Sequence, residues 1–264
     1  MAINTGWRRA ALEYMQTGLA LAAVLIAWEI VCDVWHVPSW LLPAPSRIVV
    51  ETWDIRQILP LHFAITLSEV IGGFFLAILA GVPLAIMVVY SRVLRRIIYP
   101  VLLMLQSVPK VALAPLLLIW VGYGLTSNMA VAAMVAFFPI VINTATGLES
   151  VDSELLDLTS SFESSKFKVF WKVRLPWSLP YIFSSLKVAI TLSVIGAIVA
   201  EFIGADRGLG YLMLTSSGAM KTSLMFGVLV LLSLLGIICF YAVCGAERLI
   251  CPWYLPTEND VTRL

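Results

Sequence analysis

Lys110 is the residue with the clearest potential for chemistry, because it is a charged side chain inside a long apolar run. It lies between Pro109 and Pro115. Ionisable groups in such runs usually face a cavity or one another, since hydrocarbon cannot solvate them. Proline also breaks a helix and frees backbone carbonyls that need new donors. Lys110 is therefore expected either to line a path for a polar solute or to bond the freed carbonyls.

Three other polar residues in apolar runs, Gln106, Asn143 and Glu201, are expected to line the same path. Glu201 lies near one end of its run, so its side chain can also extend outward to water or contribute to a gate at that end. Lys187 lies toward the opposite end of the same run. We expect Lys187 to extend its amine to the membrane surface rather than to face the path.

Motifs that carry catalysis are missing from the sequence. The chain contains no Gly-x4-Gly-Lys-Ser/Thr phosphate loop, no His-Glu-x-x-His and no Gly-x-Ser-x-Gly. Its four cysteines show no metal-ligand spacing. We therefore predict no catalytic residue, no metal ligand and no cofactor in this chain. If transport is driven by ATP, the ATPase must be another polypeptide.

The composition places these residues in a membrane protein. Of 264 residues, 61% are apolar and only 12% are charged, whereas about 25% are charged in soluble domains. The mean hydropathy is +0.96, and the net charge of +1 provides no general attraction to nucleic acid. Soluble enzymes, nucleic-acid binders and disordered scaffolds are excluded. The chain is predicted to be an all-α polytopic membrane protein with a single transmembrane domain over residues 1–264.

Six segments approach the length of about 20 apolar residues that a helix needs to cross a bilayer. They are residues 18–35, 66–90, 99–121, 127–148, 180–203 and 222–244. The second carries Gly73, Ala77 and Gly81 on one helical face. Small residues at this spacing let another helix approach closely, so this face is predicted to be a helix–helix contact.

Lysine and arginine are distributed unequally between the two sides of these spans, and this predicts an orientation. With the N-terminus inside, the inner segments hold eleven: Arg8, Arg9, Arg92, Arg95, Arg96, Lys166, Lys168, Lys172, Arg174, Arg248 and Arg263. The outer segments hold four: Arg47, Arg56, Arg207 and Lys221. Both termini are therefore expected to be cytoplasmic.

Residues 149–176 form the longest predicted inner loop and have a pattern of their own. Two short helices are predicted, each after a polar capping residue: Glu154–Phe162 after Asp152 or Ser153, and Lys166–Val173 after Ser164 or Ser165. Leu175-Pro176 is expected to end the second helix. Both helices are amphipathic, so their apolar faces need a cover. Periodicity alone leaves two covers equally open, the lipid surface or a cytoplasmic partner protein.

A family resemblance favours the partner protein. The loop reads Asp157-Leu158-Thr159-Ser160-Ser161-Phe162-Glu163, then nine residues, then Val173-Arg174-Leu175-Pro176. It resembles the EAA loop of ABC importer permeases, Glu-Ala-Ala-x3-Gly-x9-Ile-x-Leu-Pro, with the same spacing. Asp157 and Val173 stand for the Glu and the Ile, and Leu175-Pro176 are identical. Leu158 and Thr159 replace the two alanines, and Glu163 replaces the glycine between the helices. The resemblance implies that these residues and Phe162 form the coupling helix that inserts into an ATPase subunit.

Other stretches resemble the nitrate/sulfonate/taurine-type permeases. They include Leu42-Pro43-Ala44-Pro45, residues 108–116, residues 120–124, and residues 200–205 with Gly208-Leu209-Gly210. The end of the chain, Glu247-Arg248-Leu249 followed by Pro252-Trp253, is similar to the branch that serves pyrimidine thiamine precursors or riboflavin. Together these stretches extend over most of the chain, from about residue 40 to residue 254.

The resemblance implies a type I ABC importer permease in a bacterial inner membrane. Its expected partners are a second permease copy in a homodimer, two ATPase subunits that bind ATP and Mg, and a soluble or lipid-anchored binding protein that delivers a small polar nutrient. No nucleic acid is expected.

Two other classes remain to be weighed. An ion-coupled carrier acting alone needs a buried carboxylate near the midplane, and Glu201 is too close to an end. A membrane-embedded enzyme needs a nucleophile–base or metal constellation, and none is visible.

Overall fold

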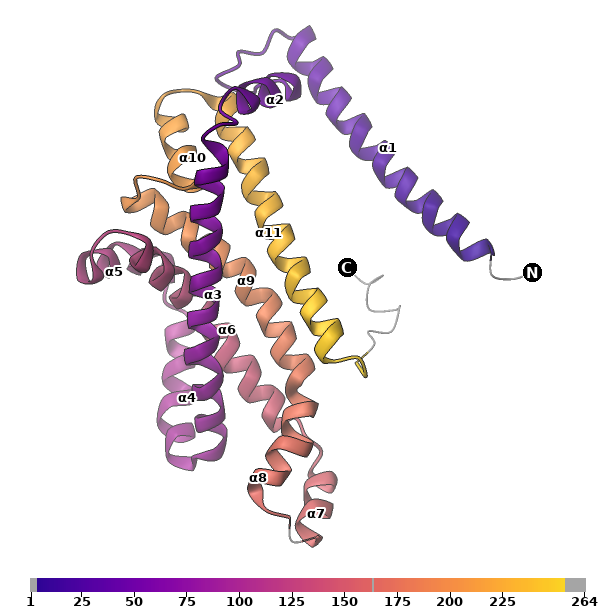
Figure 1. The fold of residues 1–264 in the computed structure, drawn as a ribbon, viewed down its shortest axis with the longest axis vertical. Helices are drawn as coiled ribbons and strands as arrows, with labels where there is room; N and C mark the ends of the chain where they lie inside the picture. The colour runs from indigo at the N-terminus through magenta and orange to yellow at the C-terminus, as the bar shows by residue number, and fades with distance from the viewer. Residues whose placement is uncertain (1–3, 163, 255–264) are drawn as a thin grey trace. The chain divides into compact units, whose positions relative to one another are not determined.

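The computed structural model describes residues 4–162 and 164–254, and every regular element among them is helical (Figure 1). The α-helices are α1 Asn4–Val34, α2 Pro45–Asp54, α3 Leu59–Tyr90, α4 Arg92–Gln106, α5 Ala114–Val121, α6 Leu125–Glu149, α7 Ser153–Ser161, α8 Lys166–Val169, α9 Leu175–Gly204, α10 Leu209–Gly218 and α11 Thr222–Ile250. A 3-10 turn, Lys110–Leu113, precedes α5, and a π-helical turn, Phe170–Arg174, joins α8 to α9. The all-α fold class is confirmed.

The chain divides into two compact units. One contains residues up to Pro60 together with Leu212–Leu231, and the other contains Leu61–Tyr211 together with residues from Leu232 onward. In the first unit, the backbone N–H of Ser46 at the start of α2 donates to the carboxylate of Glu29 on α1 (3.0 Å). The Thr222 hydroxyl donates to the carbonyl of Trp40 (2.8 Å). The sites described below all lie in the second unit, which we call the bundle unit.

Five described helical segments are long and apolar enough to cross a membrane: Met15–Val34, Leu59–Tyr90, Leu125–Glu149, Lys166–Gly204 and Thr222–Ile250. A sixth crossing requires the pair Arg92–Gln106 and Lys110–Val121, which is bent by 94°. The segment expected as a span over residues 99–121 is therefore broken between Gln106 and Lys110, beside the proline where a break was expected. Pro109 lies in this break, where its missing N–H would otherwise interrupt a helical hydrogen bond.

Helix α6 is the centre of the bundle unit, and α3 and α9 pack closely against it. A Cβ added to Gly73 on α3 would lie 2.8 Å from the carbonyl oxygen of Met129 on α6, and one on Gly196 of α9 would lie 2.8 Å from the Cα of Ala132. About two turns further along α3 and α6, Gly81 faces Ile140. The small-residue face predicted for the second span is confirmed as a helix contact, because only glycine permits backbones this close.

The predicted end of the second loop helix at Leu175-Pro176 is wrong. The chain stays helical from Lys166 to Gly204, and Pro176 lies in the first turn of α9. Proline is tolerated there because the first N–H groups of a helix have no intrahelical acceptor. The wider turn Phe170–Arg174 absorbs the lost hydrogen bond, as π-helical turns commonly do inside longer helices.

Candidate functional sites at the two ends of the bundle unit

The two short helices of the 149–176 loop lie together at one end of the bundle unit (Figure 1). The Asp152 carboxylate accepts the N–H of Glu154 (3.0 Å) and caps α7. The Ser165 hydroxyl accepts the N–H of Lys168 (3.4 Å) and caps α8. Both predicted caps are confirmed, since a side-chain oxygen before each helix satisfies an N–H that the helix cannot.

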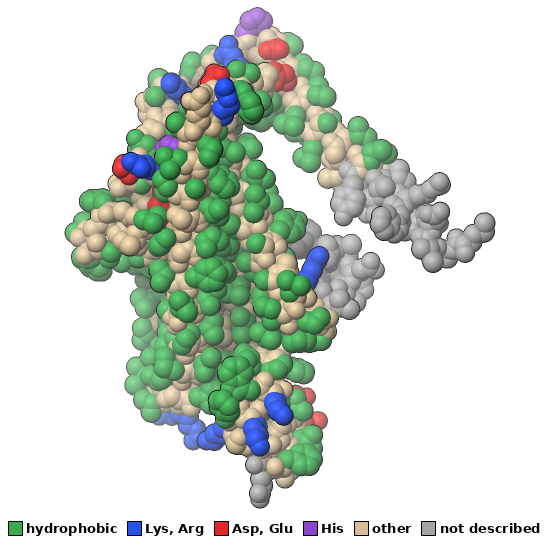
Figure 2. All heavy atoms as spheres, viewed as in Figure 1, with side chains coloured by type: hydrophobic (Ala, Val, Ile, Leu, Met, Phe, Trp, Pro, Cys, Tyr) green, Lys and Arg blue, Asp and Glu red, His purple; other side chains and the backbone are tan. Residues whose placement is uncertain are grey.

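Four large apolar side chains of this loop are exposed. The exposed fractions are 55% for Leu158, 74% for Phe162, 72% for Phe167 and 53% for Trp171. We call these four residues the apolar loop face. Lysine and arginine side chains gather at the same end of the unit (Figure 2), and they include Arg92, Arg95, Arg96, Lys166, Lys168 and Lys172. An apolar face among exposed charges is typical of a protein docking surface.

The other loop residues of the predicted coupling set occupy different positions. Asp157 is exposed, whereas Thr159 is half-buried and its hydroxyl donates to the carbonyl of Leu156 (2.8 Å). Val173, Leu175 and Pro176 are half-buried where the loop passes into α9. Glu163, which stands in the position of the family glycine, lies outside the described residues.

Arg174 and Phe170 fasten the loop to the bundle. The Arg174 guanidinium donates to the carbonyl of Leu148 at the end of α6 (3.1 Å) and lies 5.6 Å from the ring centre of Tyr90, the last residue of α3. The ring of Phe170 packs edge-on against Tyr90 at 5.9 Å. A displacement of the loop would therefore act directly on the ends of α3, α6 and α9, because charged and aromatic contacts join all three.

Lys110 lies at the bend between α4 and α5 and not within a straight span. Its ammonium donates to the backbone carbonyl of Gln106 (3.2 Å) and lies 4.9 Å from the ring centre of Phe138 on α6. Of the two roles that the sequence left open, the bond to a freed carbonyl is present. Lys110 remains half-buried, so the same ammonium is also within reach of a solute at the bend.

The four residues predicted to line one path do not form one cluster. The Gln106 side chain is exposed at the end of α4, and Asn143 is half-buried on α6. Glu201 is only 1% exposed, in the last turn of α9. None of the hydrogen bonds found among the described residues links Glu201 to Gln106, Lys110 or Asn143. The expectation that Glu201 extends outward to water is wrong.

Glu201 instead belongs to a buried polar cluster at the end of the bundle unit opposite the loop. Thr66 on α3 donates its hydroxyl hydrogen to Glu201 Oε1 (2.6 Å). The backbone N–H groups of Gly210 and Tyr211 donate to Glu201 Oε2, the latter at 3.2 Å. Glu201 thus caps the start of α10, where backbone N–H groups have no intrahelical acceptor.

Glu69 on α3 is the second acid of this cluster and is also 1% exposed. Asn128 on α6 donates its amide to Glu69 Oε1 (2.7 Å). Sequence reasoning did not single out Glu69, because it lies near the end of its apolar run. One local signal was available: Thr66 and Glu69 are three residues apart, so both face the same side of α3.

The residues around Gly208 complete the cluster. The N–H of Gly208 donates to Nδ1 of His62 (3.0 Å), and the N–H of Leu209 donates to the Thr66 hydroxyl (2.8 Å). Gly208 has a φ of +116°, and a Cβ there would collide with the Glu201 carboxylate. Glycine is therefore required at this turn both by the backbone conformation and by the proximity of Glu201.

A cavity of about 800 Å³ adjoins the cluster. Glu69 and Asn128 form part of its wall, and Asp206 and Arg207 line it together with Tyr123. The side chains of Asp206 and Arg207 are largely exposed, with 4.0 Å between Oδ2 and Nε. The volume suits a small polar molecule.

Lys187 does not extend to the membrane surface, so that expectation is wrong. Its ammonium pairs with the carboxylate of Glu247 on α11 (2.5 Å). The Lys187 side chain is 27% exposed and the Glu247 side chain is 11% exposed. The pair satisfies two charges inside the apolar region, which is the usual condition for ionisable residues there.

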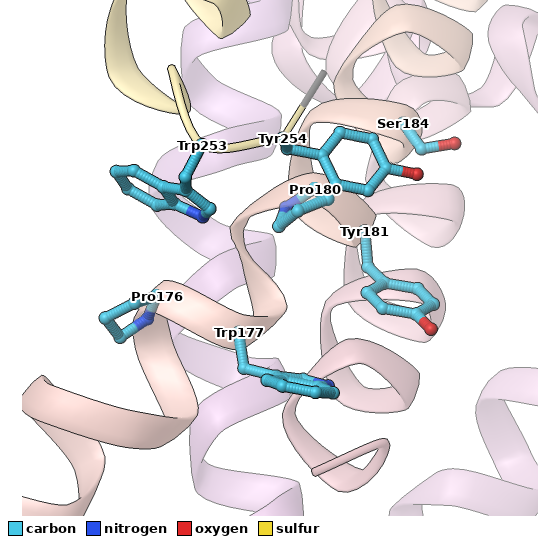
Figure 3. Close-up of a pocket in the computed structure, with 7 residues that line it drawn as sticks. All are labelled: Pro176, Trp177, Pro180, Tyr181, Ser184, Trp253 and Tyr254. Carbon is cyan, nitrogen blue, oxygen red and sulfur yellow. The ribbon is translucent and has the colours of Figure 1, made fainter. Parts of the chain in front are cut away.

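An aromatic pocket of about 470 Å³ lies near the C-terminal end of α11. Figure 3 shows the rings of Trp177, Tyr181, Trp253 and Tyr254 around Pro180, with Ser184 at one side. None of the lining residues is charged. Aromatic rings of this kind are enriched at membrane–water interfaces.

Comparisons with known proteins agree with this architecture. Residues 60–246 match the family described as "Binding-protein-dependent transport system inner membrane component". The chain is 33% identical to the formylaminopyrimidine transport permease protein of Halalkalibacterium halodurans, over 91% of this chain and 96% of that protein. It is 32% identical to the riboflavin transport system permease protein of Chloroflexus aurantiacus, over 91% of each chain.

A solved structure shares the fold. A chain from the inward-facing MetNI methionine ABC transporter superimposes with a TM-score of 0.65 at 20% identity, over 75% of this chain and 98% of that one. The expected type I importer permease fold is confirmed by this likeness together with the family match.

Proposed function

This chain belongs to the family of binding-protein-dependent transport system inner membrane components, and from that premise we propose how it works as the permease subunit of an ABC importer. The observation that carries the proposal is the apolar loop face, which is exposed beside exposed lysines and arginines at one end of the bundle unit. This face inserts into a cleft of an ATPase subunit. The apolar loop face and the residues around it form the coupling loop. Those surrounding residues are Asp157, Thr159, Glu163, Val173, Leu175 and Pro176.

The transport cycle follows from this docking. Two ATPase subunits bind ATP and Mg, which this chain does not, and each holds one coupling loop of a permease homodimer. Closure of the ATPases on ATP draws the two loops together. Because Arg174 and Phe170 join the loop to the ends of α3 and α6, the helices rock as rigid bodies and open the path on the opposite side. Hydrolysis resets the inward-facing state.

The orientation follows from the same arrangement. The loop end, rich in lysine and arginine, faces the cytoplasm, and both termini are cytoplasmic in a bacterial inner membrane. A soluble or lipid-anchored binding protein delivers the substrate on the other side. The substrate is a small polar nutrient. A pyrimidine-like thiamine precursor is favoured over a sulfonate, taurine or nitrate, since the formylaminopyrimidine permease is among the relatives with 33% identity over nearly the full length.

Purification of the tagged chain in mild detergent, followed by mass spectrometry of the proteins that come with it, tests this function. We expect an ABC ATPase subunit in equimolar amount. A chain that purifies stably and alone from its native host would overturn the docking assignment and favour an ion-coupled carrier.

Lys110→Met is expected to change the apparent affinity or selectivity of transport more than the amount of assembled protein. The substitution removes a charge at the bend, and the lost hydrogen bond to the Gln106 carbonyl costs about 1–2 kcal/mol because the group is only half-buried. The measurement is the KM of substrate uptake beside the membrane level of the chain. Lys110→Arg, which keeps the charge, is the matched control. Loss of assembled protein with Lys110→Met alone would show that the residue serves structure and not the path.

A further inference from the structure

Glu69 and Glu201 form a buried pair of acids without a cation. Glu201 accepts the hydroxyl hydrogen of Thr66, which lies three residues before Glu69 on the same side of α3, and each acid is only 1% exposed. The ion pairs found among the described residues join Arg95 to Glu149, Lys187 to Glu247 and Arg207 to Asp206, and none reaches this pair. Two neighbouring carboxylates as buried as these repel each other strongly when both are charged, and no ion pair with a described lysine or arginine offsets the repulsion.

The hydrogen-bond donors around the two acids are distributed unequally. Glu201 accepts from the Thr66 hydroxyl and from the N–H groups of Gly210 and Tyr211. Glu69 accepts only from the Asn128 amide, and its Oε2 is buried with no donor among the described residues. The three donors stabilise the charged carboxylate form of Glu201. The Glu69 Oε2 atom has no donor and lies near a second carboxylate, so it is the oxygen that would carry a proton.

We propose that Glu69 and Glu201 form a buried proton-binding site, in which Glu69 is a neutral carboxylic acid and donates its O–H to the Glu201 carboxylate. A proton on Glu69 Oε2 gives this otherwise unsatisfied oxygen a hydrogen bond to make. The pair then carries one negative charge and not two, which explains why no described lysine or arginine forms an ion pair with it. The charge is held by the start of α10, whose N–H groups point at Glu201. The proton stays in place throughout transport.

The other titratable groups nearby do not replace this proton. His62 on α3 is engaged at Nδ1 with the N–H of Gly208, and its ring stacks on that of Tyr211 at 6.2 Å. Asp206, Arg207 and Tyr123 line the adjoining cavity. The Asp206 side chain is 93% exposed and the Arg207 side chain is 61% exposed. The α6 side contributes only the neutral Asn128 to the bonds of the pair.

The hydrogen bonds around this proton link four helices. Glu69 and Thr66 belong to α3, Asn128 to α6 and Glu201 to α9, and the bonded N–H groups begin α10. Glu69 and Glu201 are therefore positioning residues, since they hold helix ends beside the cavity and not a reacting group. Their role predicts an asymmetry: an amide can replace the acid at Glu69 but not the carboxylate at Glu201.

The test compares Glu69→Gln with Glu201→Gln in the full-length chain, purified in detergent at neutral pH. Glutamine at position 69 can still donate an N–H to Glu201 and accept from Asn128, so we expect its Tm to stay within about 2 °C of the parent. Glutamine at position 201 keeps one acceptor oxygen in place of two and turns an amide N–H toward groups that now donate to the carboxylate, so part of the cluster loses its acceptor. Its Tm is expected to fall by roughly 5 °C or more. Asp54→Asn, an exposed carboxylate on α2, is the control for charge loss alone.

Infrared spectroscopy assigns the proton independently of stability. The parent chain should show the carbonyl stretch of a protonated carboxylic acid, and Glu69→Gln should remove it. This comparison holds even if the Glu201 variant does not fold. The proposal is overturned if the parent shows no such band, if the band survives Glu69→Gln, or if Glu69→Gln lowers the Tm as much as Glu201→Gln. None of these outcomes bears on ATPase docking, which involves the opposite end of the bundle unit.

Discussion

Phe162→Asp is expected to abolish substrate uptake while leaving the amount of chain in the membrane unchanged. Phe162 ends α7 and is 74% exposed, so its ring contributes little to the stability of this chain. In the complex that we propose, the ring is buried in the ATPase cleft, and a carboxylate in its place costs several kcal/mol of desolvation. Aromatic anchors of this kind commonly carry 2 kcal/mol or more of binding free energy, roughly a thirtyfold loss of affinity. Uptake of labelled substrate and the ATPase recovered with the tagged chain measure the two effects.

The control for Phe162→Asp introduces the same charge elsewhere on the same helix. Ser153 is exposed at the first position of α7, where a negative charge is favourable near the helix N-terminus. Ser153→Asp should transport normally. Leu158→Asp, on the apolar loop face, should behave like Phe162→Asp. If uptake survives in both apolar-face variants and the ATPase still co-purifies, the docking surface has been assigned to the wrong residues.

Lys187→Met is expected to destabilise the folded chain by about 3 kcal/mol, at the low end of the range for broken buried pairs. The substitution leaves the Glu247 carboxylate, with 11% side-chain exposure, without its cation. The effect is at the low end because Lys187 keeps 27% of its exposure and some water reaches the pair. The expected signs are a reduced yield of monodisperse protein and a Tm lowered by roughly 6–12 °C.

A double substitution separates the ion pair from simple loss of packing. Lys187→Met combined with Glu247→Gln removes both charges, and we expect it to recover most of the stability, because no uncompensated charge remains. The coupling free energy between the two sites is obtained from the four Tm values as a double-mutant cycle. Equal instability of the single and double variants would show that packing of the lysine stem, and not the pair, holds α9 to α11.

The loop and the helices were predictable because their signals are local. Asp152 and Ser165 each lie directly before a short amphipathic segment, and capping depends on residues within one helical turn. The class of the protein followed from composition, since a chain with 61% apolar residues lacks the polar surface that water requires. The spacing of the loop residues was also visible in the sequence, and it led to the importer family before any contact was known.

The polar residues inside the spans were predicted less well, because their partners come from distant parts of the chain. Lys187 meets Glu247, and Glu201 meets Thr66 and Glu69, across separations that no periodicity reports. A proline break was expected beside Lys110, but the angle of 94° between the two helices there was not predictable. A proline indicates that a helix can break, but the packing of neighbouring helices decides whether it bends, and Pro176 is accommodated in α9 without a break.

The sequence by itself determined that this protein is a helical membrane permease with a coupling-type loop, because hydropathy, caps and motif spacing are properties of neighbouring residues. Only the tertiary structure decided which charges are paired, which acids are buried together, and which apolar side chains stay exposed. The physical reason is that the free energy of a charge in an apolar region depends on the few groups within hydrogen-bond distance. Those groups are brought together by helix packing, such as the approach of α3 and α9 to α6 at Gly73 and Gly196.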